Sequence, residues 1–111
     1  MAINMRSRGL VDNLNEFNYH ILGCGAIGSA AALQLVRMGA ENFVLHDNDT
    51  VDTANIGVSQ YTLHDLDHSK VITLESHLKD INDNIEVMCV NELFGNYMYM
   101  NNNDIIVLGF D

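Results

Sequence analysis

A glycine-rich turn between an apolar run and a helical pattern constrains the fold of this chain more than any other feature. The turn reads Gly23-Cys24-Gly25-Ala26-Ile27-Gly28, and we call it the glycine loop. In this pattern the first glycine permits a tight turn, the second lets the backbone approach a phosphate, and the third lets the helix pack on the sheet. The glycine loop is therefore a candidate phosphate site at a helix N-terminus. A glycine turn of purely structural use is the alternative.

A carboxylate follows the next apolar run at the distance typical of a nucleotide-binding unit. Asp47 comes directly after the strand pattern of residues 43–46 and lies 19 positions beyond Gly28 (47 − 28). An acid at this strand tip can accept hydrogen bonds from ribose hydroxyls, or it can cap the following turn. Asp49 adds a second carboxylate. This D-x-D spacing suits a nucleoside triphosphate with Mg²⁺ better than a dinucleotide, whose pyrophosphate the extra charge would repel.

Length and charge limit the classes of partner. The chain has 111 residues, of which 48% are hydrophobic, which is enough for one small domain. Its formal charge of −10 favours basic protein segments as partners over nucleic acid or an anionic membrane. The first ten residues lack the apolar core of a signal peptide, so we expect a cytoplasmic protein. Cys24 and Cys89 are interpreted as small buried hydrophobic residues.

The rest of the sequence alternates between strand and helix patterns. Strands are predicted over residues 19–22, 42–46, 85–90 and 104–110, and helices over 26–38, 67–79 and, as a short element, 93–100. This alternation predicts an α/β fold with a Rossmann-like parallel sheet of strand order 3-2-1-4 and flanking helices. Residues 1–18 would form an N-terminal arm, and residues 19–111 the nucleotide-binding domain.

His64 and His68 could chelate Zn²⁺ on a helix, but solvated histidines are the commoner finding.

These landmarks together resemble the ThiF/MoeB/HesA family of adenylyltransferases, the bacterial relatives of ubiquitin-activating enzymes. Beyond the glycine loop, the matching residues are Asp47, Asp49, Asn55, Gln60 and Lys70. They follow the family pattern D-x-D-x-V-x-x-x-N, a downstream Gln, and a Lys that opens the next helix, which is much more specific than the glycine loop alone. The N-terminal segment Arg6-Ser7-Arg8 resembles, more weakly, a short arginine segment of the family.

The resemblance implies ATP- and Mg²⁺-dependent activation of a protein carboxylate. The C-terminal carboxylate of a ubiquitin-like or sulfur-carrier protein would become an acyl adenylate. The implied nucleotide-binding residues are Gly23, Gly25, Ala26, Ile27, Gly28, Asp47, Asp49, Asn55, Gln60 and Lys70, with Asp47 at the ribose. The implied catalytic residues are Lys70, Asp111 and Arg8, with Asp111 also binding Mg²⁺ and Arg8 reaching the nucleotide of a homodimer partner.

The chain departs from the family pattern in three ways. Residues 56–59 read Ile-Gly-Val-Ser where the family usually has an arginine, and Leu108 stands where a first, Mg²⁺-binding aspartate would fall, three residues before Asp111. The chain also corresponds only to the N-terminal, nucleotide-binding half of the family domain. Losing one electrostatic group typically costs about 10²–10³ in rate, so we expect the 111-residue chain alone to be inactive.

Two other functions stay open at this point. One is the NAD-binding Rossmann domain of an oxidoreductase, and the other is a noncatalytic interaction module that keeps the ThiF-like fold. The sequence also predicts self-association, because few helices are available to cover the sheet. The apolar residues expected to be open to water include Ile105, Ile106, Val107 and Phe110.

Overall fold

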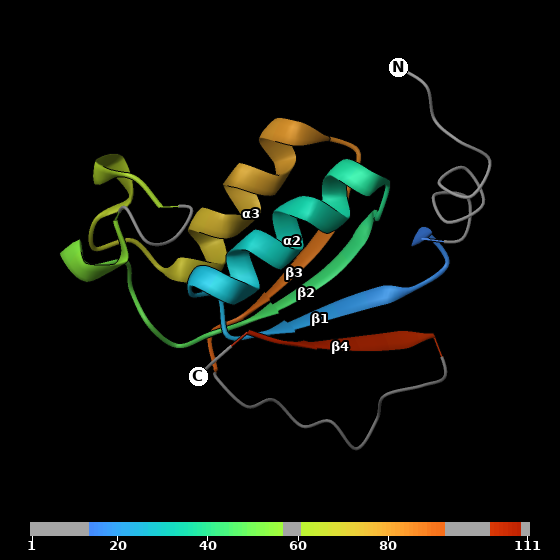
Figure 1. Ribbon diagram of the computed structural model, residues 1–111, viewed down its shortest axis with the longest axis horizontal. Coiled ribbons are helices and arrows are strands. Elements are labelled where there is room, and N and C mark those ends of the chain that lie inside the picture. The colour runs from blue at the N-terminus through green and yellow to red at the C-terminus, as the bar shows by residue number, and fades with distance from the viewer. Residues whose placement is uncertain (1–13, 57–60, 93–102, 110–111) are drawn as a thin grey trace.

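The computed structural model describes residues 14–56, 61–92 and 103–109 of the chain (Figure 1). Its strands are β1 (Asn18–Leu22), β2 (Asn42–His46), β3 (Glu86–Val90) and β4 (Asp104–Leu108), and its helices are α2 (Ala26–Met38) and α3 (Lys70–Ile81). Two short 3-10 turns, Thr53–Asn55 and Leu63–Asp65, lie in the long connection between β2 and α3. The elements therefore alternate as the sequence predicts.

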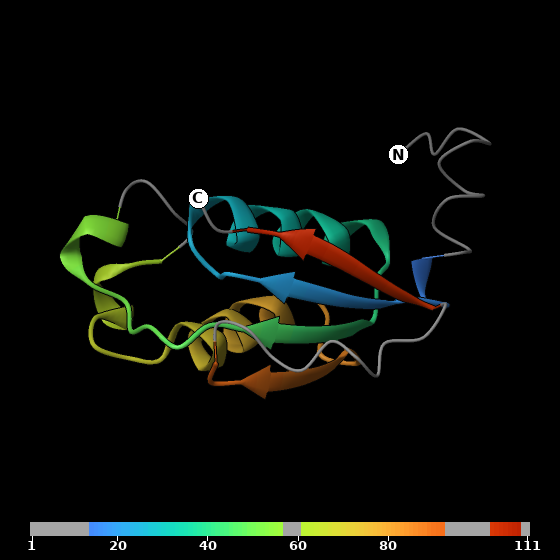
Figure 2. The same cartoon turned by 90° about the horizontal axis from the view of Figure 1, so that it is seen from below.

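The four strands form one parallel sheet in the order β3-β2-β1-β4. This finding confirms the predicted α/β class and the strand order 3-2-1-4. Both helices lie on the same face of the sheet and pack against each other, as Figures 1 and 2 show. The crossovers from β1 to β2 and from β2 to β3 step in one direction across the sheet, so right-handed connections place both helices on one side.

The core lies between this helical layer and the sheet. Alternate strand residues face the helices, and Tyr19, Ile21, Phe43 and Leu45 are each at most 2% exposed. The helices contribute buried apolar residues at helical spacing, namely Ala32, Leu33, Val36, Val71, Leu74 and Leu78. Full burial of a large apolar side chain is worth about 1.5–3 kcal/mol, so this layer supplies most of the stabilisation.

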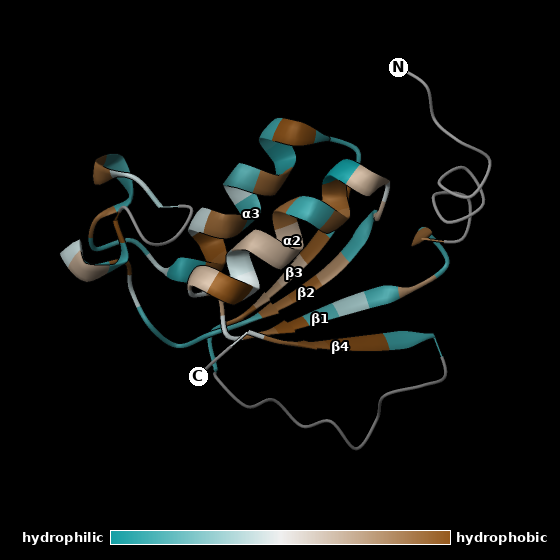
Figure 3. Cartoon of the chain, in the orientation of Figure 1, coloured by the Kyte–Doolittle hydropathy of each residue, from teal (hydrophilic) through white to brown (hydrophobic). Residues whose placement is uncertain are grey.

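The opposite face of the sheet carries a mixed surface that no described helix covers. A row across the strands runs Met88, Val44, His20 and Ile106, in the observed register. Met88 and Ile106 are exposed, as is Leu108 in the next row. Figure 3 shows that the strands are apolar along much of their length, counting the residues of both faces. Val107 was expected to be open to water, but it faces the helices and packs against the core.

The ends of the helices follow from their local sequence. Gly39 ends α2 in a left-handed conformation, with φ of 114°, which a residue without a Cβ adopts at little cost. The periodicity predicted that this helix begins near residue 67, but α3 begins at Lys70. The reason is Asp67, whose positive φ of 66° is incompatible with a helix and turns the chain just before Ser69.

Some of the sequence predictions fall on residues outside the described ranges. These are the N-terminal arm with Arg8, Gln60, the short helix over residues 93–100, Phe110 and Asp111. Within the described ranges, no helix has the length and apolar character needed to cross a membrane.

Candidate functional site

The glycine loop lies at the carboxyl end of β1, where it is tightly packed. Gly23 has a φ of 93°, and its N–H donates to the carbonyl oxygen of His46 at 2.8 Å. A Cβ on Gly28 would lie 1.8 Å from the carbonyl oxygen of Gly23, and a Cβ on Gly109 would lie 2.3 Å from the same oxygen. The loop, the first turn of α2 and the end of β4 therefore approach one another closely enough to exclude any side chain at these two positions.

The second glycine of the loop is in a different environment. A Cβ added to Gly25 would meet no atom of the described residues within 4 Å. Gly25 is the N-cap of α2, no side chain of the described residues caps this helix, and its first turn contains no acidic residue. The first N–H groups of a helix have no partner within the helix, so they are available to an anion. Ala26 and Ile27 begin this turn and are exposed.

Asp47 joins the glycine loop to the end of β2. One of its carboxylate oxygens accepts from the N–H of Cys24 at 2.7 Å, and the other accepts from the N–H of Asp49 at 2.9 Å. The side chain is almost fully buried, with the residue only 4% exposed. A carboxylate has about four acceptor positions, so two are left for further donors such as ribose hydroxyls. The structure shows that Asp47 also organises the loop itself.

Lys70 and Asp49 lie beside the loop. The Lys70 Nζ is 3.9 Å from a carboxylate oxygen of Asp49, and the backbone N–H of Lys70 donates to the Asp49 carbonyl at 3.0 Å. The Lys70 side chain is largely buried, whereas that of Asp49 is 69% exposed. The start of α3 is thereby fixed next to the end of β2, with a cation near the glycine loop.

The Cys24 thiol is buried beneath the loop and is free. Burial, with a smaller contribution from the Asp47 carboxylate, raises the pKa of Cys24 to about 12, although the Lys70 ammonium opposes the shift. The thiol is therefore protonated at neutral pH and is neither a nucleophile nor a metal ligand there. It fills space as the small hydrophobic residue that the sequence predicted.

Asn55 lies farther along the connection between β2 and α3. Its side-chain oxygen accepts from the N–H of Asp52 at 2.9 Å, and the Asp52 side chain caps the same 3-10 turn.

His64, one of the two candidate zinc ligands, lies in the second 3-10 turn, which is not an α-helix. The described residues include no group of three or more His, Cys, Asp or Glu that could hold a metal ion.

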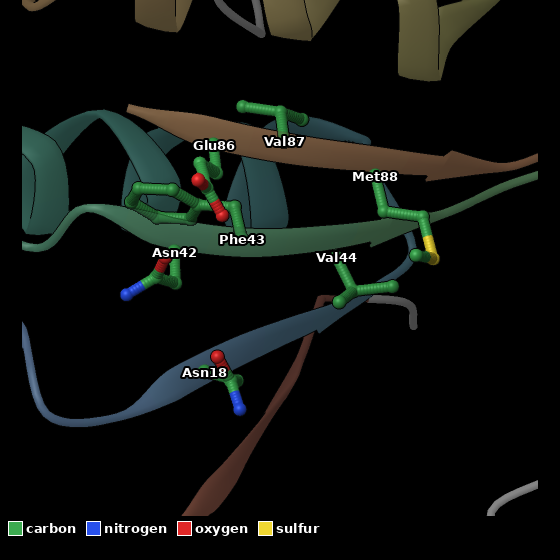
Figure 4. A pocket seen from close by; sticks show the side chains of 7 residues that line it. All are labelled: Asn18, Asn42, Phe43, Val44, Glu86, Val87 and Met88. Carbon is green, nitrogen blue, oxygen red and sulfur yellow. The ribbon is translucent and has the colours of Figure 1, made fainter. Parts of the chain in front are cut away.

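A hollow of about 250 Å³ lies elsewhere on the sheet and is lined by residues of β1, β2 and β3 (Figure 4). Asn18, Asn42 and Glu86, which all lie at the first residue of their strands, form one end of it. Ligands of parallel α/β sheets bind at the carboxyl ends of the strands. The hollow lies toward the opposite ends, so it is separate from the glycine loop.

Two residues at the site were not found from the sequence. Tyr61 is 3% exposed and donates its hydroxyl hydrogen to the carbonyl oxygen of Cys24, and Gly109 packs against Gly23 and Gly28. For Gly109 a signal existed, because a glycine directly after a strand often marks a close backbone approach. For Tyr61 the sequence offers none, since its partner is 37 residues away.

Comparison with known proteins gives a consistent match. The model of the ThiF family matches residues 2–111. Ubiquitin-like modifier-activating enzyme 5 from Branchiostoma floridae is 35% identical over 85 residues, which are 74% of this chain and 21% of that relative. The chain thus spans about a fifth of the length of this curated relative.

Two solved structures of Escherichia coli MccB have a similar fold. One, with ATP, superposes with a TM-score of 0.73 at 26% identity and covers 79% of this chain and 26% of that chain. The other, of MccB alone, superposes with a TM-score of 0.80 at 24% identity and covers 95% of this chain and 35% of that chain. The similarity therefore extends over nearly the whole of this chain and about a third of MccB or less.

Proposed function

The chain belongs to the ThiF family, and we propose that it is the ATP-binding part of an adenylyltransferase that activates the C-terminal carboxylate of a ubiquitin-like or sulfur-carrier protein. One observation carries the proposal: the glycine loop presents an uncapped helix start with open space at Gly25. Asp47 and Lys70 lie beside this opening. The arrangement offers N–H donors and a cation to phosphate groups, and a carboxylate to a ribose.

The proposed reaction needs positioning and charge neutralisation more than proton transfer. A carboxylate oxygen of the carrier protein attacks the α-phosphorus of ATP, an oxygen–phosphorus bond forms, and pyrophosphate leaves. The loop N–H groups and the Lys70 ammonium would stabilise the charge on the phosphates as this occurs. Within this proposal, Asn55 and Gln60 contact the triphosphate, and Arg8 acts from a partner copy.

Magnesium fits the proposal as a companion of the nucleotide. Mg²⁺ is commonly held by one or two protein carboxylates together with substrate phosphates and water. Asp111 is the proposed protein ligand, and Mg²⁺ would supply further neutralisation of phosphate charge.

The comparisons support ATP as the nucleotide and do not identify the carrier protein. MccB has been crystallised with ATP and, separately, with MccA, and the Branchiostoma relative is described as an activating enzyme for a ubiquitin-like modifier. By extension, the substrate of this protein would be the terminal carboxylate of a small protein or peptide. A noncatalytic interaction module is the second candidate, because Leu108 and residues 56–59 lack the usual acid and arginine.

Calorimetric titration of the full-length protein tests nucleotide choice. We expect ATP with Mg²⁺ to bind more tightly than NAD, because the exposed Asp49 carboxylate adds negative charge that a metal ion can offset. A control titration with ATP and excess chelator should show weaker binding. If NAD instead binds at least tenfold more tightly, a difference of about 1.4 kcal/mol, the oxidoreductase alternative replaces this proposal.

Self-association through the face of the sheet that no described helix covers is a further part of the proposal. Met88, Ile106 and Leu108 are 63%, 46% and 62% exposed on that face. A two-fold dimer that buries about 1,200–2,000 Å² would remove them from water and could bring Arg8 to the neighbouring nucleotide. Light scattering should give a dimer mass, and Met88→Lys should lower it. A stable monomer at tens of micromolar contradicts both the dimer and the proposed role of Arg8.

A further inference from the structure

Tyr61 reaches the glycine loop from the long connection between β2 and α3. It is 3% exposed, and its hydroxyl donates to the carbonyl oxygen of Cys24. The N–H of the same residue, Cys24, donates to Asp47 at 2.7 Å. Side chains from two separate segments therefore bind the N–H and the carbonyl oxygen of Cys24. The next residue, Gly25, is the one with open space beside it.

The geometry of the peptide bond extends this effect to Gly25. In a planar trans peptide the carbonyl of one residue and the N–H of the next point in opposite directions. Because the Cys24 carbonyl points at Tyr61, the Gly25 N–H points away from Tyr61. Gly25 is also where an added Cβ would meet nothing within 4 Å, so a ligand has room beside this peptide.

Tyr61 is itself held in place. Its ring meets the ring of His77 edge to face, at 6.2 Å between centroids and 73° between planes. His77 Nε2 lies 3.1 Å from a carboxylate oxygen of Asp65, which also accepts from the N–H of Thr62 at 2.7 Å. Burial, followed by the nearby Cys24, raises the pKa of Tyr61, so the hydroxyl keeps its proton and can donate throughout the physiological pH range.

We propose that Tyr61 is a positioning residue for phosphate binding: its hydroxyl fixes the Cys24–Gly25 peptide so that the Gly25 N–H is oriented for a phosphate group. The inference rests on the nucleotide binding proposed above. It goes beyond that proposal by assigning a role in the site to a residue outside the family pattern of the sequence. The hydroxyl acts on the phosphate only through the loop and makes no contact with the base or ribose.

Tyr61→Phe tests this role, because it removes the hydroxyl and keeps the ring. In calorimetric titrations of the full-length protein, ATP with Mg²⁺ should bind about tenfold more weakly to the variant, whereas adenosine should bind within about twofold of wild type. Tyr19→Phe is the matched control. Tyr19 is also buried, at 2% exposed, and its hydroxyl also donates to a backbone carbonyl, that of Leu14 at 3.0 Å. This control should not change the affinity for ATP.

The outcomes separate the two proposals. If wild type binds neither ATP nor adenosine, nucleotide binding fails and the role of Tyr61 fails with it. If wild type binds ATP and a folded Tyr61→Phe binds it equally well, or loses ATP and adenosine affinity together, only the positioning role is overturned. Should Tyr61→Phe not fold, wild type is titrated with pyrophosphate and followed by NMR. A shift of the Gly25 amide resonance supports the inference, and an unshifted one overturns it.

Discussion

Gly28→Ala is expected to lower the free energy of unfolding by roughly 3 kcal/mol, which is at the upper end of the usual cost of overpacking. The new Cβ would lie 1.8 Å from the carbonyl oxygen of Gly23, and this neighbour is backbone rather than a flexible side chain. Either α2 or the glycine loop at the end of β1 must move to relieve the contact. In a domain of this size the melting temperature should fall by about 10 °C or more.

Gly25→Ala is the matched control for this substitution. It makes the same chemical change three positions earlier, where a Cβ meets nothing within 4 Å and φ is −81°. Its effect on the free energy of unfolding should stay within about 1 kcal/mol, and the sign can be a slight gain because alanine restricts the unfolded chain. Thermal unfolding followed by circular dichroism compares the two variants. Equal melting temperatures would show that Gly28 does not maintain the close packing of α2 on the sheet.

The sheet could be predicted from the sequence because its determinants are local patterns. Each strand is a short apolar run, and the alternation of strand and helix patterns predicts a parallel sheet. The strand order 3-2-1-4 is the one expected of a Rossmann-like unit whose glycine loop follows the first strand. The start of α3 was placed too early because periodicity does not register a single backbone angle. At Asp67 that angle is positive, and it overrides the helical pattern of the neighbouring residues.

The site was predicted less completely, because part of it depends on contacts between distant segments. The position of Asp47 follows from its place at the end of β2, since parallel strands end at a common edge of the sheet. Its hydrogen bond from the Asp49 N–H is a local turn contact between residues two positions apart. By contrast, its bond from the Cys24 N–H and the contact from Tyr61 to Cys24 join segments 23 and 37 residues apart. Hydrogen bonds at such sequence separation are products of tertiary packing, and no spacing rule encodes them.

Gly25→Val is expected to lower the affinity for ATP by about 100-fold or more, which corresponds to about 2.7 kcal/mol, while the protein stays folded. The space beside Gly25 is open, because a Cβ added there would have no atom of the described residues within 4 Å, so the first atom of the new side chain meets no clash. The same space is where a phosphate would approach the N–H groups at the start of α2. The branched side chain would therefore exclude the ligand without disturbing the core.

The measurement pairs calorimetric titration of ATP with a thermal unfolding curve for each variant of the series Gly, Ala and Val at position 25. Affinity should fall stepwise with side-chain size, whereas the melting temperature should stay nearly constant. The opposite pattern is expected at position 28, where the smallest side chain already costs stability. A folded Gly25→Val variant that binds ATP as wild type does would show that the loop is a structural turn only. In that case nucleotide binding must be sought away from the carboxyl end of β1.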